Sequence, residues 1–193
     1  MACVVFVKSI PTKKRVELGV FSDAIQHVFT VSEATYKSLG EYKVGDEIAE
    51  NDLGTLRFED EYLRALKRAT SSLSLSDKSR FALKTKLIQA GFSGDASDMA
   101  LDRLAELGYL DEERQLERAV EKEANYNLRG RYYIKRKLAA KGYSSSSVSR
   151  AIDALVERGE IDFPLNFERL AQKKGALTDD ERLALQYKFG YKI

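Results

Sequence analysis

Hydrophobic residues alternate with polar ones in the first third of the chain and then recur every three or four positions. The alternating runs are rich in β-branched and aromatic residues and predict three strands, at residues 3–7, 15–20 and 25–31. Ser32 then fits the N-cap of a short helix that stops at Gly40, and Ile48 closes this part of the chain. We therefore expect residues 1–56 to form a small N-terminal β-rich module.

The helical part of the chain contains an internal repeat. Residues 80–111 align without a gap onto residues 131–162, at a constant offset of 51, and twelve of the 32 aligned positions are identical. The shared positions predict a helix, a glycine stop, a second helix and another glycine stop. The glycines that we expect to end helices are Gly91, Gly108, Gly142 and Gly159, and the N-caps that we expect after them are Ser93, Asp111, Ser144 and Asp162.

A preceding helix completes each repeat and gives units of three short helices. In the last helix of the second unit, apolar residues from Val148 to Val156 predict one continuous buried face, which residues 100–105 repeat in the first unit. Phe189-Gly190-Tyr191 echoes Lys141-Gly142-Tyr143, so a third unit stops before its last helix. The expected fold is mainly α, with tandem three-helix repeats in an elongated curved array behind the β-rich module. The predicted repeats are residues 59–110, 111–161 and, incomplete, 162–193.

Composition removes most enzyme chemistry. Cys3 is the one cysteine and His27 the one histidine, so an internal disulfide and a Cys₂His₂ or Cys₄ metal site are excluded. We interpret His27 as a strand residue and Cys3 as a small buried side chain. The sequence has no glycine-rich phosphate loop, and its acidic clusters precede helices, where the helix dipole explains them. We expect no catalytic residue, no cofactor, no metal and no membrane span, and we expect a cytoplasmic monomer.

Charge is concentrated in the second repeat. Residues 129–150 carry seven basic side chains and no acidic one, whereas the equivalent residues 78–99 reach a net charge of only +2. Tyrosines interleave with these cations, as in proteins that bind single-stranded nucleic acid. This basic stretch either binds a polyanion, meaning nucleic acid or an acidic protein surface, or is merely a solvated face. The candidate binding residues are Arg80, Lys84, Lys86, Arg129, Arg131, Lys135, Arg136, Lys137 and Lys141.

The spacing of basic, leucine and glycine positions resembles that of the RecX family of recombination regulators. In the first copy the pattern consists of Arg80, Lys84, Lys86, Leu87, Gly91, Phe92, Ala100, Leu101, Leu104, Gly108, Tyr109, Leu110 and Asp111. In the second copy it continues with Leu138, Gly142, Ala151, Ile152, Leu155 and Gly159, but Glu160-Ile161-Asp162 departs from it. The resemblance implies a non-enzymatic cytoplasmic protein that binds the RecA nucleoprotein filament, limits its ATPase activity and strand exchange, and tempers the SOS response.

A different function also fits the charges. The chain could be a direct nucleic-acid-binding protein that uses the basic second repeat, with single-stranded DNA as a ligand or with the last helix of a repeat reading a duplex. In the second repeat that helix offers only Arg150 and Arg158, beside Asp153 and Glu157. Few side chains there could read base edges.

Overall fold

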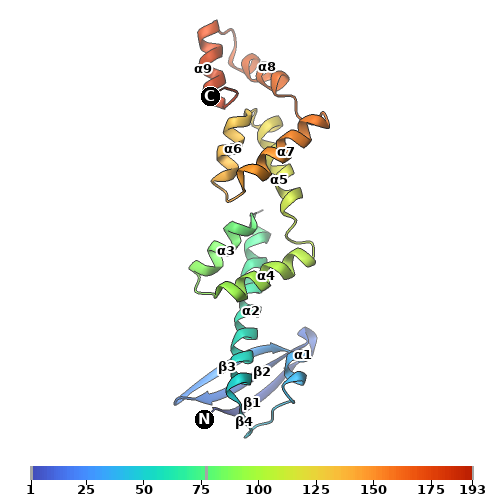
Figure 1. Cartoon of the computed structure of the whole chain (residues 1–193), viewed down its shortest axis with the longest axis vertical. Helices are drawn as coiled ribbons and strands as arrows, with labels where there is room; N and C mark the ends of the chain where they lie inside the picture. The colour runs from blue at the N-terminus through green and yellow to red at the C-terminus, as the bar shows by residue number, and fades with distance from the viewer. Residues whose placement is uncertain (1, 77, 193) are drawn as a thin grey trace. The chain divides into compact units, whose positions relative to one another are not determined.

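The computed structural model describes residues 2–76 and 78–192, in two compact units. One unit takes in the chain up to Leu75 together with Lys84–Tyr109, and the other takes in Ser76–Leu83 and the chain from Leu110 onward. The first unit holds a sheet and helices, and the second is helical (Figure 1). A mainly helical fold with a small N-terminal sheet was predicted, and the structure confirms it. The elongation of the array and the boundaries of its repeats stay predictions.

The N-terminal sheet has four antiparallel strands in the order β3-β2-β1-β4. These are β1 (Ala2–Ile10), β2 (Arg15–Ser22), β3 (Ile25–Ser32) and the short β4 (Glu47–Ile48), with a 3₁₀ turn η1 (Pro11–Lys13) between β1 and β2. The three strands predicted from alternation are confirmed. The Ser32 side chain accepts a hydrogen bond from the Thr35 N–H and so caps α1 (Glu33–Ser38), as expected. Cys3 is half-buried rather than buried.

A single long helix, α2 (Glu50–Leu75), serves both the sheet and the first repeat. Its first turns supply Leu53 and Leu56 to the core under the sheet. Farther along, buried residues such as Leu63 share the first repeat with α4, and α2 runs from the sheet to that helix in Figure 1. The predicted boundary between residues 56 and 59 therefore falls inside one continuous helix, since no proline interrupts the chain there.

The helices of the structure repeat with the same offset of 51 residues as the sequence. The helices concerned are α3 (Arg80–Gln89), α4 (Gly94–Glu106), α5 (Glu112–Glu121), α6 (Arg131–Ala139), α7 (Ser145–Glu157) and α8 (Phe163–Lys174). The starts of α3, α4 and α5, at 80, 94 and 112, recur at 131, 145 and 163 in α6, α7 and α8. Helix starts that repeat at one constant offset indicate that the repeated sequence encodes a repeated structure.

The helix ends follow the predicted capping chemistry. Gly142 has a φ of +88°, and the Tyr143 N–H donates to the Leu138 carbonyl, which completes a Schellman motif after α6. Gly91 does the same after α3, with a φ of +89°. The side chains that cap the following helices, as predicted, are Ser93, Asp111, Ser144 and Asp162.

The buried face of α7 is shorter than predicted. Val148, Ile152 and Leu155 are buried, but Val156 is 37% exposed, and its equivalent in the first repeat, Ala105, is also exposed. Both residues lie in the last turn of their helix, where the glycine turn leads the chain away from the core. The continuous apolar stripe therefore ends one position early in both copies.

The third repeat packs α8 against α9 (Asp179–Phe189), and Phe167, Leu170 and Leu185 form its core. Between α5 and α6 the helix widens into a π-helical turn, η2 (Lys122–Tyr126), which the sequence pattern did not indicate. Across residues 2–76 and 78–192, every helix is too short or too polar to cross a membrane.

Candidate functional site

The start of α6 is held against the end of α9. The Gly130 N–H donates to the Phe189 carbonyl at 2.8 Å, and the Tyr132 N–H donates to the Gly190 carbonyl at 3.0 Å. A Cβ added at Gly130 would collide with the Gly190 backbone, so only glycine permits this approach. The contact fixes the basic helix of the second repeat beside the last helix of the third.

The two helices together line a cationic pocket of about 350 Å³. Its lining residues are Tyr132, Tyr133, Arg136, Tyr187, Lys188, Gly190 and Lys192. Tyr132 is 43% exposed and Tyr187 is 51% exposed, so both aromatic rings are available to a ligand. The lining contains three cations and no carboxylate, which favours a ligand that is anionic and has flat, stackable groups.

Arg129 has an internal role at the edge of this pocket. Its guanidinium carbon lies 4.4 Å from the ring centre of Tyr133 and 4.4 Å from that of Phe189. The cation is therefore held between two aromatic rings and ties the start of α6 to α9. Next to it, burial raises the pKa of Tyr191 to about 12, and the Tyr191 hydroxyl donates to the Leu128 carbonyl at 3.1 Å.

Several predicted binding residues have carboxylate partners. Arg131 pairs with Asp153 at 2.5 Å, and Lys137 pairs with Glu123, which is only 6% exposed, at 2.7 Å. These pairs link α6 to α7 and to η2. A cation whose charge is compensated by a close carboxylate attracts a polyanion less strongly, so both residues brace the helix.

The remaining candidates divide between the two units. In the described part of the chain, no carboxylate partner is found for Lys135, Arg136 and Lys141. Lys84 pairs with Asp98 at 2.6 Å and Lys86 donates to Ser72 Oγ at 3.1 Å, and all four belong to the first unit. The Arg80 backbone N–H donates to Glu112 Oε1 at 3.1 Å. Of the predicted binding residues, Arg136 alone lines the cationic pocket.

The last helix of the second repeat has little free positive charge. Arg158 hydrogen-bonds to both Glu160 and Glu117, and these hydrogen bonds raise the pKa of its guanidinium. Asp153 is occupied by Arg131, which leaves Arg150 as the exposed cation of α7. A recognition-helix role in duplex DNA would need more free arginine or lysine side chains on this helix than it offers.

Sequence reasoning missed half of the pocket. Tyr187, Lys188 and Lys192 come from the third repeat, which the charge count did not include. The echo of residues 141–143 at 189–191 is the signal that could have found them, because it places the end of α9 at the position that the end of α6 occupies in the preceding repeat.

Comparison with known proteins gives one family name. No family model matches the chain. The regulatory protein RecX of Clostridioides difficile (strain 630) is 28% identical over 132 residues, which cover 68% of this chain and 60% of that protein. The proteins of the same name from Lactobacillus johnsonii and Clostridium tetani are each 28% identical and cover 76% and 84% of this chain. The chain spans 60% of the length of the first of these relatives and 54% of the second.

A solved structure agrees with the fold. A crystal structure of regulatory protein RecX superposes with a TM-score of 0.69 and 17% identity, and the match covers 99% of this chain and 93% of that one. At this identity the likeness concerns the fold alone. Together with the named relatives it confirms the resemblance to the RecX family that the repeat pattern indicated.

Proposed function

We propose that this chain, a member of the RecX family, regulates RecA in the cytoplasm by binding as a monomer to the RecA filament on single-stranded DNA. Binding would limit filament ATPase activity and strand exchange and so temper the SOS response. The observation that carries this proposal is the cationic pocket, because it presents three cations and three tyrosines without a carboxylate. No step of the proposal involves catalysis by the chain itself.

The pocket supports two kinds of contact with such a filament. Arg136, Lys188 and Lys192 can pair with DNA phosphate or with carboxylates on the surface of a filament subunit. Tyr132 and Tyr187 can stack on exposed bases, and each stacked base is worth about 1 to 3 kcal/mol. A bound chain then occupies surface that filament growth or the closing of subunits requires.

The test is inhibition of RecA ATPase activity on single-stranded DNA by the purified chain. A variant in which Arg136, Lys188 and Lys192 are replaced by Glu should lose inhibition by at least about tenfold in the concentration required, since three phosphate contacts become repulsive. The matched control replaces three exposed cations outside the pocket, Lys67, Arg68 and Lys174, by Glu and should inhibit normally. Equal loss in both variants would mean that net charge, and not the pocket, carries inhibition.

Direct binding of single-stranded DNA is the second candidate, and the exposed tyrosines beside cations favour it. Three cations on phosphate predict a slope of log K against log salt of about −2. If the chain binds bare DNA with that slope, and if the salt concentration that releases it from bare DNA also releases it from RecA filaments, DNA binding accounts for the activity. Retention on filaments at salt that strips the chain from bare DNA would support RecA as the partner.

A further inference from the structure

The start of α3 docks on the end of α6 within the second unit. Ser79 Oγ donates to the Lys141 carbonyl at 2.9 Å. Phe81 lies so close to Gly142 that a Cβ added there would be 2.9 Å from the phenyl ring. The start of one middle helix thus fits onto the glycine turn that ends the next middle helix, with a small residue and an aromatic residue at the contact.

The same contact recurs one repeat later, where the start of α6 meets the end of α9. Gly130 stands at the position of Ser79 and donates to the Phe189 carbonyl, and a Cβ added at Gly190 would collide with Tyr133. Two independent copies therefore show what this kind of glycine turn binds. Each receives the first turn of a helix that has a small N-cap residue, then an arginine, and then at least one aromatic residue.

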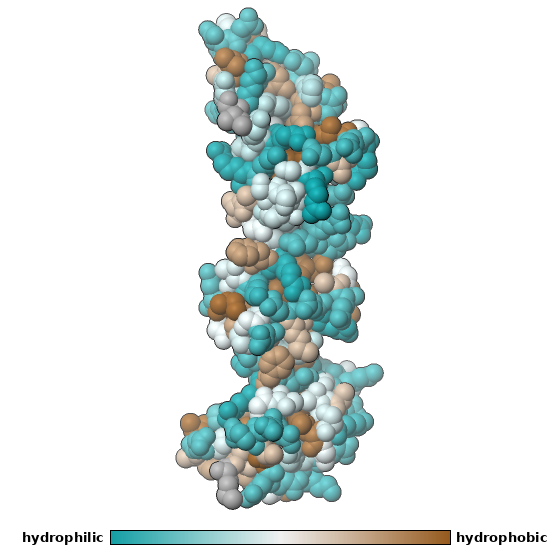
Figure 2. Space-filling view, in the orientation of Figure 1, coloured by the Kyte–Doolittle hydropathy of each residue, from teal (hydrophilic) through white to brown (hydrophobic). Residues whose placement is uncertain are grey.

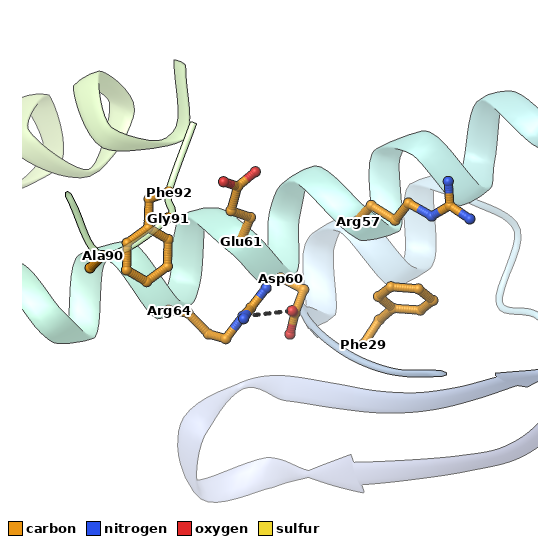
Figure 3. Close-up of a pocket in the computed structure, with 8 residues that line it drawn as sticks. All are labelled: Phe29, Arg57, Asp60, Glu61, Arg64, Ala90, Gly91 and Phe92. Atoms are coloured by element: carbon orange, nitrogen blue, oxygen red, sulfur yellow. Dashed lines mark ion pairs between the residues drawn. The ribbon is translucent and has the colours of Figure 1, made fainter. Parts of the chain in front are cut away.

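The first repeat has the same turn, and among residues 2–76 and 78–192 no helix start docks on it. Gly91 stands at the position of Gly142, and a Cβ added there would meet no described atom within 4 Å. A pocket of about 280 Å³ opens at this place instead (Figure 3). We call this cavity the Gly91 pocket. Its lining residues all belong to the first unit and are Phe29, Arg57, Asp60, Glu61, Arg64, Ala90, Gly91 and Phe92.

An acidic residue of the Gly91 pocket also matches the occupied copy. Glu61 precedes Glu112 by the repeat offset, and Glu112 accepts the backbone N–H of Arg80 at the start of the docked helix. Glu61 instead accepts from the N–H and the hydroxyl of Ser93, at 2.5 and 3.1 Å. The carboxylate that binds a helix start in one repeat is therefore present in the other, where it lines the pocket and a docked helix start would share it with Ser93.

The rim of the Gly91 pocket carries two arginines. Arg64 pairs with Asp60 at 2.9 Å, and Figure 3 shows this pair on the same helix as Arg57. In the described part of the chain, Arg57 has no ion-pair partner. Asp60 and Glu61 balance the two arginines in the same lining, so the pocket does not require its occupant to carry a particular net charge.

We propose that the Gly91 pocket is a docking site for the start of a helix from a partner protein. The occupant has a small N-cap residue and an aromatic residue in its first turn, as Ser79 and Phe81 have at the equivalent site. Its first backbone N–H groups bind Glu61 and the carbonyl of Ala90, and its aromatic ring packs between the Gly91 turn and Phe92. This site is separate from the cationic pocket, so the two proposals stand or fall independently.

A peptide copied from this chain is a defined probe of the site. Residues 78–90, acetylated and amidated, contain the first turn of α3 and are titrated into the full ¹⁵N-labelled chain. Because a peptide of this length is a marginal helix in water, we expect a dissociation constant of about 1 mM. The amide signals of Gly91 and Ser93 should shift and saturate. The same peptide with Phe81→Ala should shift them at least about fivefold less at equal concentration, since the ring is lost.

A pair of glycine variants tests the same point from the side of the protein. Gly91→Asn adds a Cβ in open space, and asparagine is among the residues that adopt a positive φ at least cost, so the chain should stay folded with some backbone strain while the close approach of a helix start is blocked. Gly108→Asn is the matched control, because Gly108 also has a positive φ and open surroundings but does not line the pocket. Peptide binding should be lost in the first variant and kept in the second. Absence of shifts at 5 mM peptide, or equal binding by both variants or both peptides, would overturn the proposal.

Discussion

The middle helices of the first and second repeats hold equivalent lysines in different ways. Lys86 in α3 and Lys137 in α6 are 51 positions apart and both reach back to the preceding helical segment. Lys86 meets the hydroxyl of Ser72 at 3.1 Å, whereas Lys137 meets the buried carboxylate of Glu123 at 2.7 Å. The same position thus carries a hydrogen bond from the ammonium group to a neutral hydroxyl in one repeat and an ion pair in the other.

At the other lysine position that the two repeats share, the lysine of the first repeat has the carboxylate partner. Lys84 pairs with Asp98 at 2.6 Å, but its equivalent Lys135 has Ser149 at the position of Asp98 and no carboxylate partner in the described chain. The repeats therefore exchange which lysine is compensated. Sequence identity between repeats predicts where a cation lies, and its partner decides whether the charge is available to a ligand.

The largest expected effect is at Lys137. Lys137→Met leaves the Glu123 carboxylate buried without its cation, and we expect a loss of about 2 kcal/mol in the free energy of unfolding, because the lysine end of the pair is partly exposed. Lys86→Met removes a single hydrogen bond and should cost about 1 kcal/mol or less. Urea unfolding followed by circular dichroism measures both. Equal losses would break the distinction between the two repeats.

A smaller effect extends the comparison to the third repeat, where Tyr191 stands at the position of Tyr143. Burial raises the pKa of Tyr191 from 10.0 to about 12, so the unfolded chain loses this proton first. The stabilisation is complete below pH 10 and is lost as the pH rises from 10 to 12. Allowing for solvent screening of a half-buried group, we expect a fall of about 1 kcal/mol. Tyr191→Phe should flatten the profile of unfolding free energy in this range by that amount, relative to wild type.

The smallest effect on stability is expected at the equivalent lysines Lys84 and Lys135. Lys84→Met should change the free energy of unfolding by less than about 0.5 kcal/mol, since both side chains of its ion pair are about 40% exposed. Lys135→Met should be neutral for stability but should weaken the proposed inhibition of RecA if the charge of the second repeat contacts the filament. If inhibition responded to Lys84→Met and not to Lys135→Met, the assignment of the binding charge to the second repeat would be wrong.

Local structure was predictable because its causes are local. Gly142 and Ser144 indicate a helix end and the next helix start within three residues. The alternation of apolar and polar residues in residues 25–31 likewise predicts one strand. The extent of α2 was not predictable, because a helix that changes partners from a sheet to other helices keeps the same period throughout. Only the core that each turn contacts distinguishes its two halves.

The pocket was less predictable than the fold. Arg131 and Lys137 are indistinguishable from Arg136 by charge, and the structure separates them through Asp153 and Glu123, which lie 22 and 14 positions away in sequence. Tyr187 and Lys188 were missed because a count of charges along one segment cannot show which other segment lies beside it. Pairing between distant residues is a property of packing, which no single stretch of sequence encodes.

The continuous α2 helix limits how the N-terminal sheet can be exchanged or removed. Cutting at residue 59 would expose Leu53 and Leu56 on a severed sheet and would leave the first repeat with a frayed new terminus. The two parts share one stretch of backbone hydrogen bonds, so they should melt together rather than one after the other. A homologue that carries a different N-terminal extension would therefore have to join it to the start of this helix and keep the whole of α2.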